Sequence, residues 1–274
     1  MTRSYFLLLI YLTICLFIIS QGCVKTITHG QMRGNLIEVL NSIDTYGYEM
    51  EMDMETSIAG ENSSEIVKSN GNGNIDIKNK RMRISININE TTNKGKSKST
   101  ETEIYVFDIM EYIQFGKDGE WIKFEVPRHK LDRENRLKKQ MKLLMTSKIK
   151  NLEDETLENI DCYLLNIEPD KEAFWKVIME QEEEHPLLKL LNLDYEDVVK
   201  DMDMKVWISK NKFFPMKCMM EMRAVIEREI IKAPFKMTIN TKATYRYYGH
   251  NKSLTIKLPE QAKKARIYKE EEWD

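Results

Sequence analysis

Histidine and cysteine are scarce in this sequence, and their scarcity limits the chemistry that the chain can support. The 274 residues include four histidines and four cysteines. No histidine lies in a Gly-x-Ser-x-Gly, His-Glu-x-x-His or Cys-x-x-Cys context, and all four fall in predicted loops or tethers: His29, His129, His185 and His250. We therefore expect a protein that is not an enzyme and that has no metal site and no cofactor.

An excess of either charge is also absent. Lys and Arg total 42 and Asp and Glu total 44, which gives a formal net charge of −2. The charges are mixed along the chain, as on a solvated surface, and this balance does not predict nucleic acid as a partner. We expect no nucleic-acid partner.

Long hydrophobic runs are limited to one, at the N-terminus. Residues 5–19 are almost entirely apolar, follow Arg3 and lead to Ser20-Gln21-Gly22-Cys23. A basic head, an apolar run and small residues predict a signal peptide over residues 1–22. Gly22-Cys23 resembles the lipobox of prokaryotic lipoproteins, which implies lipidation of Cys23, although that family usually has Leu, Val or Ile in place of Ser20 and a small residue in place of Gln21.

Two alternatives to lipidation stay open for this segment. Its length is close to the lower limit for crossing a bilayer, so it could remain as an uncleaved anchor helix, and plain secretion is the third possibility. In each case the rest of the chain lies outside the cytoplasm, and we expect it to be held on the extracytoplasmic face of the cell membrane. The predicted organisation is a signal peptide (1–22), a lipid-anchored tether (23–31), one domain (32–268) and an acidic tail (269–274).

Two cysteines, Cys162 and Cys218, remain after the signal peptide and the lipidation site are set aside. Outside the cytoplasm they could pair as a disulfide. They could equally be two buried thiols that act as small apolar side chains.

Strict alternation of apolar and polar residues predicts long half-buried strands. In residues 46–55, Tyr and Met occupy every second position, with Gly, Glu and Asp between them. Similar alternation recurs at residues 82–88, 215–227 and 235–248. Further strands are predicted at 65–77, 103–107, 112–115, 121–126, 161–167, 204–209 and 254–258. Helical spacing predicts helices at residues 32–43, 132–148, 171–181 and 186–201. The predicted fold class is α+β, a large curved antiparallel sheet that forms a half-open barrel covered by helices.

One face of this sheet is unusually rich in methionine. Met is unbranched and polarizable, so a wall of Met and Tyr side chains adapts to apolar guests of different shape. The alternative is an ordinary core that happens to use Met. The residues predicted to contact an apolar ligand are Tyr46, Tyr48, Met50, Met52, Met54, Met220, Met222, Met237 and Tyr245.

The order of features resembles a known family. Its most specific pieces are Trp207-Ile208-Ser209-Lys210 followed by Phe214-Pro215-Met216-Lys217, and the terminal Leu258-Pro259-Glu260-Gln261-Ala262. Over residues 32–265 the chain resembles the LolA/LolB-like fold and, within it, the LppX/LprG-type cell-surface lipoproteins. That resemblance implies a half-barrel that binds or carries lipid. We expect a lipid-anchored protein that binds a lipid or acyl ligand in an apolar cavity. The alternative is a non-catalytic surface domain that binds a protein partner or acts as a sensor.

Overall fold

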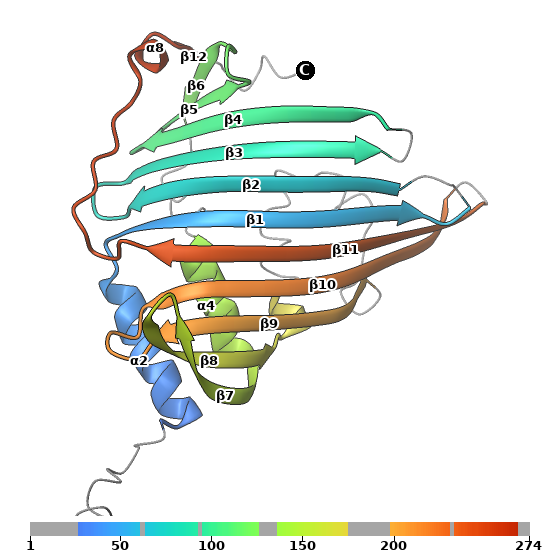
Figure 1. Cartoon of the computed structure of the whole chain (residues 1–274). Coiled ribbons are helices and arrows are strands. Elements are labelled where there is room, and N and C mark those ends of the chain that lie inside the picture. Colours follow the sequence, from blue (N-terminus) through green and yellow to red (C-terminus); the bar gives the residue numbers. More distant parts are fainter. Residues whose placement is uncertain are drawn as a thin grey trace, which may run out of the picture. The chain divides into compact units, whose positions relative to one another are not determined.

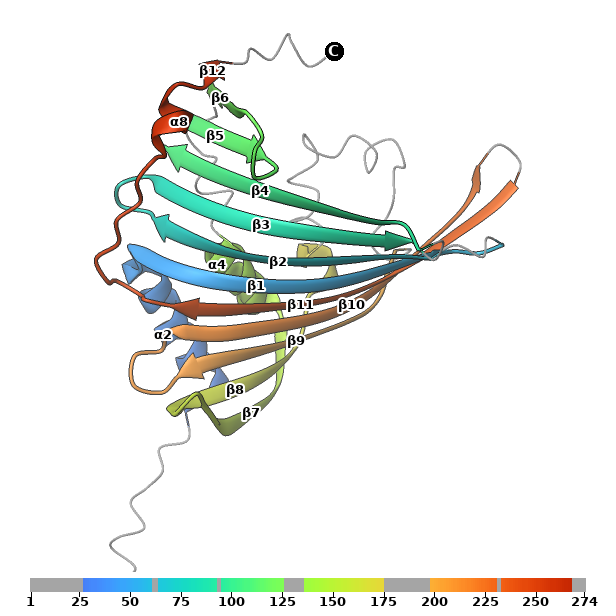
Figure 2. The same ribbon diagram turned by 45° about the horizontal axis from the view of Figure 1, so that its top comes forward.

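The structure is a computed structural model of the chain (Figures 1 and 2). It describes residues 27–60, 64–92, 95–125, 136–174, 198–230 and 233–267. Within these ranges no helix has the length and apolar character needed to cross a bilayer. The predicted signal peptide and Cys23 lie outside them. The chain divides into two compact units, Met1–Asn35 and Leu36–Asp274, and all the strands belong to the second.

The described strands form a single 12-stranded sheet, in the order β12-β6-β5-β4-β3-β2-β1-β11-β10-β9-β8-β7. All neighbours pair antiparallel except the short parallel pair of β12 with β6. The strands are β1 (Thr45–Ile58), β2 (Ser64–Asp76), β3 (Arg81–Thr92), β4 (Ser97–Phe107), β5 (Met110–Phe115), β6 (Trp121–Glu125), β7 (Lys148–Leu157), β8 (Ile160–Glu168), β9 (Val199–Ser209), β10 (Pro215–Ile230), β11 (Ala233–Tyr248) and β12 (Arg266–Ile267).

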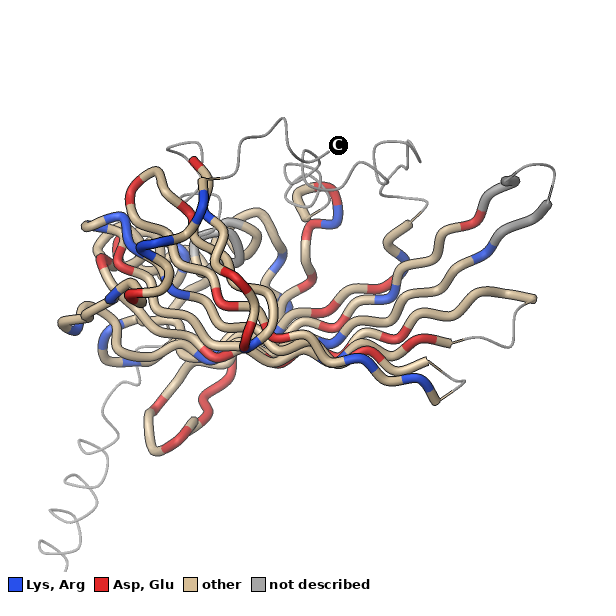
Figure 3. Tube along the Cα trace, turned by 90° about the horizontal axis from the view of Figure 1, so that it is seen from above, with Lys and Arg blue, Asp and Glu red and all other residues tan. Residues whose placement is uncertain are grey.

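Alternation along the strands gives the sheet one apolar and one polar face. On β1 the residues Tyr46, Tyr48 and Met50 are buried, whereas Glu49 and Glu51 between them are exposed. Figure 3 shows acidic and basic residues spread along the strands, with uncharged residues between them. The predicted strand that begins at Tyr46 is therefore confirmed, because every second side chain of a strand points to the same side.

Helices are few among the described residues, and the predicted α+β fold class is wrong. They are α2 (His29–Ser42), α4 (Arg136–Thr146), the one-turn α8 (Glu260–Lys263) and residues 171–174, which begin the predicted helix 171–181. The structure is one large β-sheet, and its edge strands β7 and β12 do not pair to close it. Residues 199–201, predicted as the end of a helix, begin β9 instead, because pairing with β10 decides their conformation. Residues 132–135, 175–181 and 186–197 of the predicted helices lie outside the described ranges.

Helix α4 covers part of the apolar face. It lies behind the sheet near the end where β1 begins (Figures 1 and 2), and Leu137, Met141 and Leu144 on it are buried. The C-terminal segment covers one edge of the sheet, since α8 lies against β6 and β12 pairs with β6. Residues 254–258, predicted as a strand, join no ladder and run as an extended segment towards α8.

The two remaining cysteines lie on opposite faces of the sheet, so of the two alternatives the disulfide is the one that the structure contradicts. Cys218 pairs in register with Val206 and Val206 with Leu165, which places these three residues on the apolar face. Cys162 is three positions from Leu165 and therefore faces the other side, where it packs with Leu164 and Trp207. Both thiols are free and buried, as in the alternative interpretation. Burial raises the pKa of both thiols, that of Cys218 to about 12.

The loop after β11 is fastened to the start of β1 by Asn251, which has a left-handed backbone (φ 55°). Its Oδ1 accepts a hydrogen bond of 2.8 Å from the Asp44 amide, and its Nδ2 donates one of 2.9 Å to the Ser42 carbonyl. Both polar atoms of the Asn251 side chain are therefore used within the fold.

Close packing of the Tyr48 ring on Gly73 predicts that adding a methyl group at residue 73 lowers the stability of the fold. A Cβ atom at Gly73 would lie 2.3 Å from Cε1 of the Tyr48 ring, which is buried. Gly73→Ala must displace this ring, and we expect it to lower the free energy of unfolding by about 1–3 kcal/mol, measured by urea titration of the full chain. Gly34→Ala is the matched control, because nothing lies within 4 Å of its Cβ position in α2. We expect it to be neutral or to stabilise by up to about 1 kcal/mol. Equal losses in both variants would contradict this packing.

The placement of the cysteines predicts their reactivity. In the folded full chain at pH 8, peptides that contain Cys162 or Cys218 should remain unmodified by iodoacetamide, because both thiols are buried. After unfolding in guanidinium without reductant, mass spectrometry should find both peptides alkylated. Peptides that stay unmodified until a reductant is added would show a disulfide and contradict the structure.

Candidate ligand-binding face

The nine residues predicted to contact a ligand lie on one face of three neighbouring strands. β1, β11 and β10 pair so that Met50 lies opposite Tyr245, and Tyr245 lies opposite Cys218. Further along the same face, Met237 lies opposite Ile58 at the other end of β1. The register thus brings together side chains that are almost 200 residues apart in the sequence.

The centre of this face is a patch of methionines in two adjacent rows that cross four strands. In each row a small residue of β11 lies between methionines of β1 and β10, because Ala243 and Thr241 occupy the middle positions. β9 completes both rows. We call this patch the methionine wall, which consists of Met52, Met220 and Met204 around Ala243, and Met54, Met222 and Met202 around Thr241.

Sequence reasoning missed the contribution of β9 to this wall. Met202 and Met204 alternate with acidic residues, which is the signal that could have identified them. The predicted helix was extended to residue 201, and so the beginning of β9 was not recognised. Both side chains are buried, whereas Met52, Met54, Met220 and Met222 are half-buried.

The other end of the same face is a core of tyrosines. Tyr46, Tyr48 and Tyr247 are at most 2% exposed. Their rings form a connected cluster, with centroids 6.1 Å apart for Tyr46 and Tyr247 and 6.4 Å apart for Tyr46 and Tyr48. Tyr245 is half-buried and stacks on Tyr247 at 6.4 Å. The burial of Tyr46, Tyr48 and Met50 places them in the protein core, so the half-buried methionines and Tyr245 are the predicted residues that are open to a ligand.

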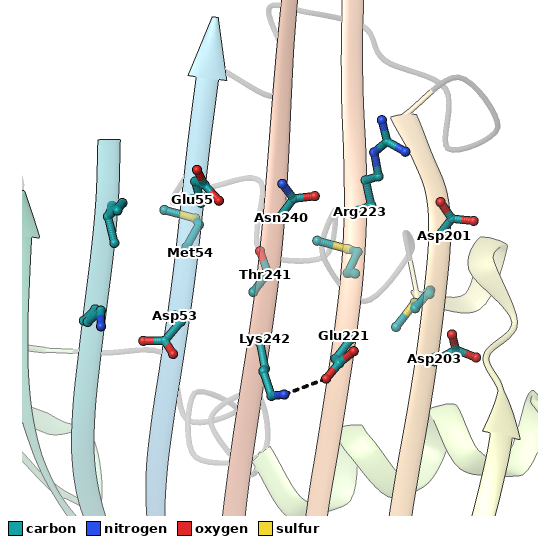
Figure 4. A pocket seen from close by; sticks show the side chains of 14 residues that line it. Asp53, Met54, Glu55, Asp201, Asp203, Glu221, Arg223, Asn240, Thr241 and Lys242 are labelled. Atoms are coloured by element: carbon teal, nitrogen blue, oxygen red, sulfur yellow. Dashed lines mark ion pairs between the residues drawn. The ribbon is translucent and has the colours of Figure 1, made fainter. Parts of the chain in front are cut away.

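A hollow of about 570 Å³ lies across the same strands (Figure 4). Its lining consists mainly of charged and polar residues of the polar face, together with Met54, Met202, Met222 and Thr241. Two rows of side chains cross β2, β1, β11, β10 and β9 here. Within them Lys242 and Glu221 form an ion pair of 2.8 Å, which raises the pKa of the Lys242 ammonium. The rows are Lys68-Asp53-Lys242-Glu221-Asp203 and Ile66-Glu55-Asn240-Arg223-Asp201.

The charges of this hollow are exposed, and opposite charges lie next to one another. Lys242 and Glu221 are both more than half exposed, so their pair adds little to stability. This exposed ladder of mixed charge is typical of a solvated face.

A second hollow, of about 730 Å³, lies at the opposite side of the sheet, near β6 and α8. Tyr105 and Trp121 meet edge to face there, with ring centroids 5.8 Å apart. The Arg83 guanidinium donates hydrogen bonds to both carboxylate oxygens of Glu103. Burial lowers the pKa of Arg83, but the hydrogen bonds and negative charge of Glu103 outweigh this effect, so the pKa of Arg83 is raised. Arg83, one of the basic residues that line this hollow, therefore already has its charge balanced by Glu103.

The described residues contain no group of three or more His, Cys, Asp and Glu side chains that could hold a metal ion. His250 is the one histidine with a shifted pKa among them. Its ring stacks on Phe214 at 4.6 Å, and burial lowers its pKa to about 4, against the smaller opposing effect of a hydrogen bond with the Pro215 backbone. It lies in the loop after β11, away from the methionine wall.

Comparison with known proteins assigns the chain to a family. A family of unknown function, DUF6612, matches residues 32–266. The chain belongs to the DUF6612 family. No curated protein matches this DUF6612 chain.

Solved structures that match the DUF6612 chain are distant. One is a DUF1329 family protein from Desulfovibrio piger, with 8% identity, a TM-score of 0.26 and coverage of 82% of this chain and 93% of that one. Another is a beta-barrel-like protein of the DUF1849 family from Brucella abortus, with 10% identity, a TM-score of 0.25 and coverage of 76% of this chain and 100% of that one. At these TM-scores neither supports an argument about fold or function, and the resemblance to LolA-like lipoproteins remains a prediction.

The environment of His250 predicts a dependence of stability on pH. Its pKa is about 4 in the fold and about 6.5 in an unfolded chain, so the unfolded state binds the proton first as the pH falls. Stability is therefore full above pH 6.5 and declines between pH 6.5 and 4, by about 2 kcal/mol for a ring that is partly exposed. His250→Phe should remove this part of the slope in urea titrations at pH 7, 5.5 and 4. An unchanged slope would contradict burial of the neutral ring.

Proposed function

We propose that this protein binds an apolar ligand, such as the acyl chain of a lipid, on the methionine wall. The observation that supports the proposal is the pair of methionine rows, in which four half-buried side chains, Met52, Met54, Met220 and Met222, flank the small residues of β11. A hydrocarbon chain laid along β11 would contact methionines on both sides. Each 100 Å² of apolar surface removed from water would contribute about 2.5 kcal/mol.

The choice of side chain favours a ligand over a dry core. A core gains most from branched side chains with defined rotamers, whereas Met has three rotatable bonds and adjusts to guests of different shape. The half-buried Met52, Met54, Met220 and Met222 lie on the same face as the buried Met50, Met202 and Met204. The partly exposed methionines leave apolar surface that a ligand would cover.

The proposed location follows from the N-terminal sequence. We propose that residues 1–23 hold the chain at the extracytoplasmic face of the cell membrane, through lipidation of Cys23 or as an uncleaved anchor. Such an anchor would keep the methionine wall close to a source of acyl chains. We propose a binding protein, not an enzyme, and the resemblance of residues 206–217 to lipid-carrying lipoproteins supports this proposal.

The alternative of a protein-binding surface has weaker support. A docking surface for a protein partner is usually a contiguous exposed apolar patch. The large apolar side chains exposed among the described residues come from five different elements: Ile37 of α2, Ile66 of β2, Phe115 of β5, Tyr248 of β11 and Ile267 of β12.

Two neighbouring residues of β11 provide a matched test. Thr241 faces the wall and Asn240 faces the polar side, so Thr241→Asp and Asn240→Asp introduce the same charge on opposite faces. The full chain would be purified in a fluorinated surfactant, which mixes poorly with hydrocarbon, and its lipids extracted and measured by mass spectrometry. We expect a lipid in wild type and in Asn240→Asp, and at least a tenfold loss in Thr241→Asp, because a carboxylate beside an acyl chain is costly to desolvate.

Circular dichroism would verify that both variants fold. Absence of lipid in wild type, together with no uptake of added dioleoylglycerol, would refute the proposed function. Equal lipid content in the two variants would show that the ligand lies elsewhere.

A further inference from the structure

The Ser69 hydroxyl on the apolar face makes no hydrogen bond within the described part of the chain. Ser69 of β2 is 6% exposed, and its Oγ is buried without a donor or acceptor in reach. It lies between Met52 of β1 and Ile88 of β3, on the same side of the sheet as the methionine wall. A buried hydroxyl that makes no hydrogen bond lowers stability, so such a group is unexpected in a core unless something else satisfies it.

The position of Ser69 connects it to the wall. It belongs to the row that continues through Met52, Ala243 and Met220. On β2 the next two positions of this face are Gly71 and Gly73. A Cβ atom at Gly73 would meet the Tyr48 ring, and one at Gly71 would lie 2.6 Å from the Ser85 carbonyl oxygen. β2 therefore presents no side chain on this face between Ser69 and Ile75.

We propose that Ser69 is the polar contact for the ligand of the methionine wall, and that its hydroxyl donates a hydrogen bond to an uncharged oxygen, such as the ester carbonyl of a neutral acylglycerol. This inference rests on the function proposed above. It adds the chemical class of the ligand: an ester-linked acyl chain is favoured over a plain hydrocarbon and over a free fatty acid.

The charges near Ser69 argue against a carboxylate. An ionised carboxyl group that leaves water needs a cation or several hydrogen-bond donors. On this part of the face the register places Glu90 in the next row, opposite Val67, and Lys98 opposite Glu90. The carboxylate of a fatty acid beside Ser69 would approach the like charge of Glu90. Lys98 lies opposite Glu90 in the register, so its positive charge is shared with that residue. A carbonyl oxygen of an ester carries no net charge and needs only one donor.

The test compares ligands with and without an oxygen on the full chain in the fluorinated surfactant. The hydrocarbon 1,6-diphenylhexatriene reports binding by its fluorescence, and dioleoylglycerol or oleate competes with it. For Ser69→Ala we expect unchanged affinity for diphenylhexatriene and about 3- to 10-fold weaker competition by dioleoylglycerol, which corresponds to the loss of one neutral hydrogen bond. Competition by oleate should be weak in wild type and unaffected by the substitution.

Ser85→Ala is the control, because Ser85 lies on β3 and faces the polar side. It should leave the affinity for every probe unchanged. In the absence of ligand, Ser69→Ala should be as stable as wild type or slightly more stable, since the hydroxyl has no partner there. A loss of stability would show that the hydroxyl is structural and would overturn the proposal.

Unchanged competition by dioleoylglycerol, or an equal weakening for diphenylhexatriene, would also overturn the role of Ser69. Competition by oleate that depends on Ser69 as strongly as that of dioleoylglycerol would overturn the assignment of an uncharged ligand. Failure of the proposed function would look different, because wild type would then bind neither diphenylhexatriene nor dioleoylglycerol.

Discussion

The pairing of β1 with β11 is the interaction on which the rest of the sheet depends. It runs without a register shift from Gly47 opposite Tyr248 to Ile58 opposite Met237. Strands β2 to β6 extend the sheet on one side of this pair and β10 to β7 on the other. Because side chains alternate with a period of two, a slip by one residue would exchange the methionines of β1 with its acidic residues. Both the apolar wall and the charged ladder of the other face therefore depend on this one register.

Much of the strand pattern could be predicted from sequence, because long half-buried strands impose a strict alternation that is visible locally. β1, β10 and β11 are examples. The failures lie where the conformation depends on a distant partner. The first half of β4 is polar, and it is a strand because β3 lies beside it; β7 has little alternation and is set by β8. The disulfide could not be judged, because the relative facing of Cys162 and Cys218 depends on the register of three strands.

The candidate site was predictable as a set of residues but not as a surface. Alternation placed the Tyr and Met side chains on one face, which the register of β1, β10 and β11 brings together. It could not distinguish the buried tyrosine end from the half-buried methionine end, since this depends on the position of α4 over the sheet. The Ser69 hydroxyl carries no local signal either, because a serine between apolar strands differs from a serine in solvent only by its neighbours.

Rigid backbone and adaptable side chains have separate roles in this arrangement. The ladders fix the positions of the Cα atoms, while methionine side chains change rotamer at little cost, so the wall accommodates acyl chains of different length and saturation. Such a surface discriminates poorly between hydrocarbons, because one additional buried methylene group changes the binding free energy by only about 1 kcal/mol. Selectivity must then come from a polar contact, and a single hydroxyl to a neutral oxygen contributes a preference of about tenfold at most. The geometry accordingly suits recognition of a class of lipids better than recognition of one molecule.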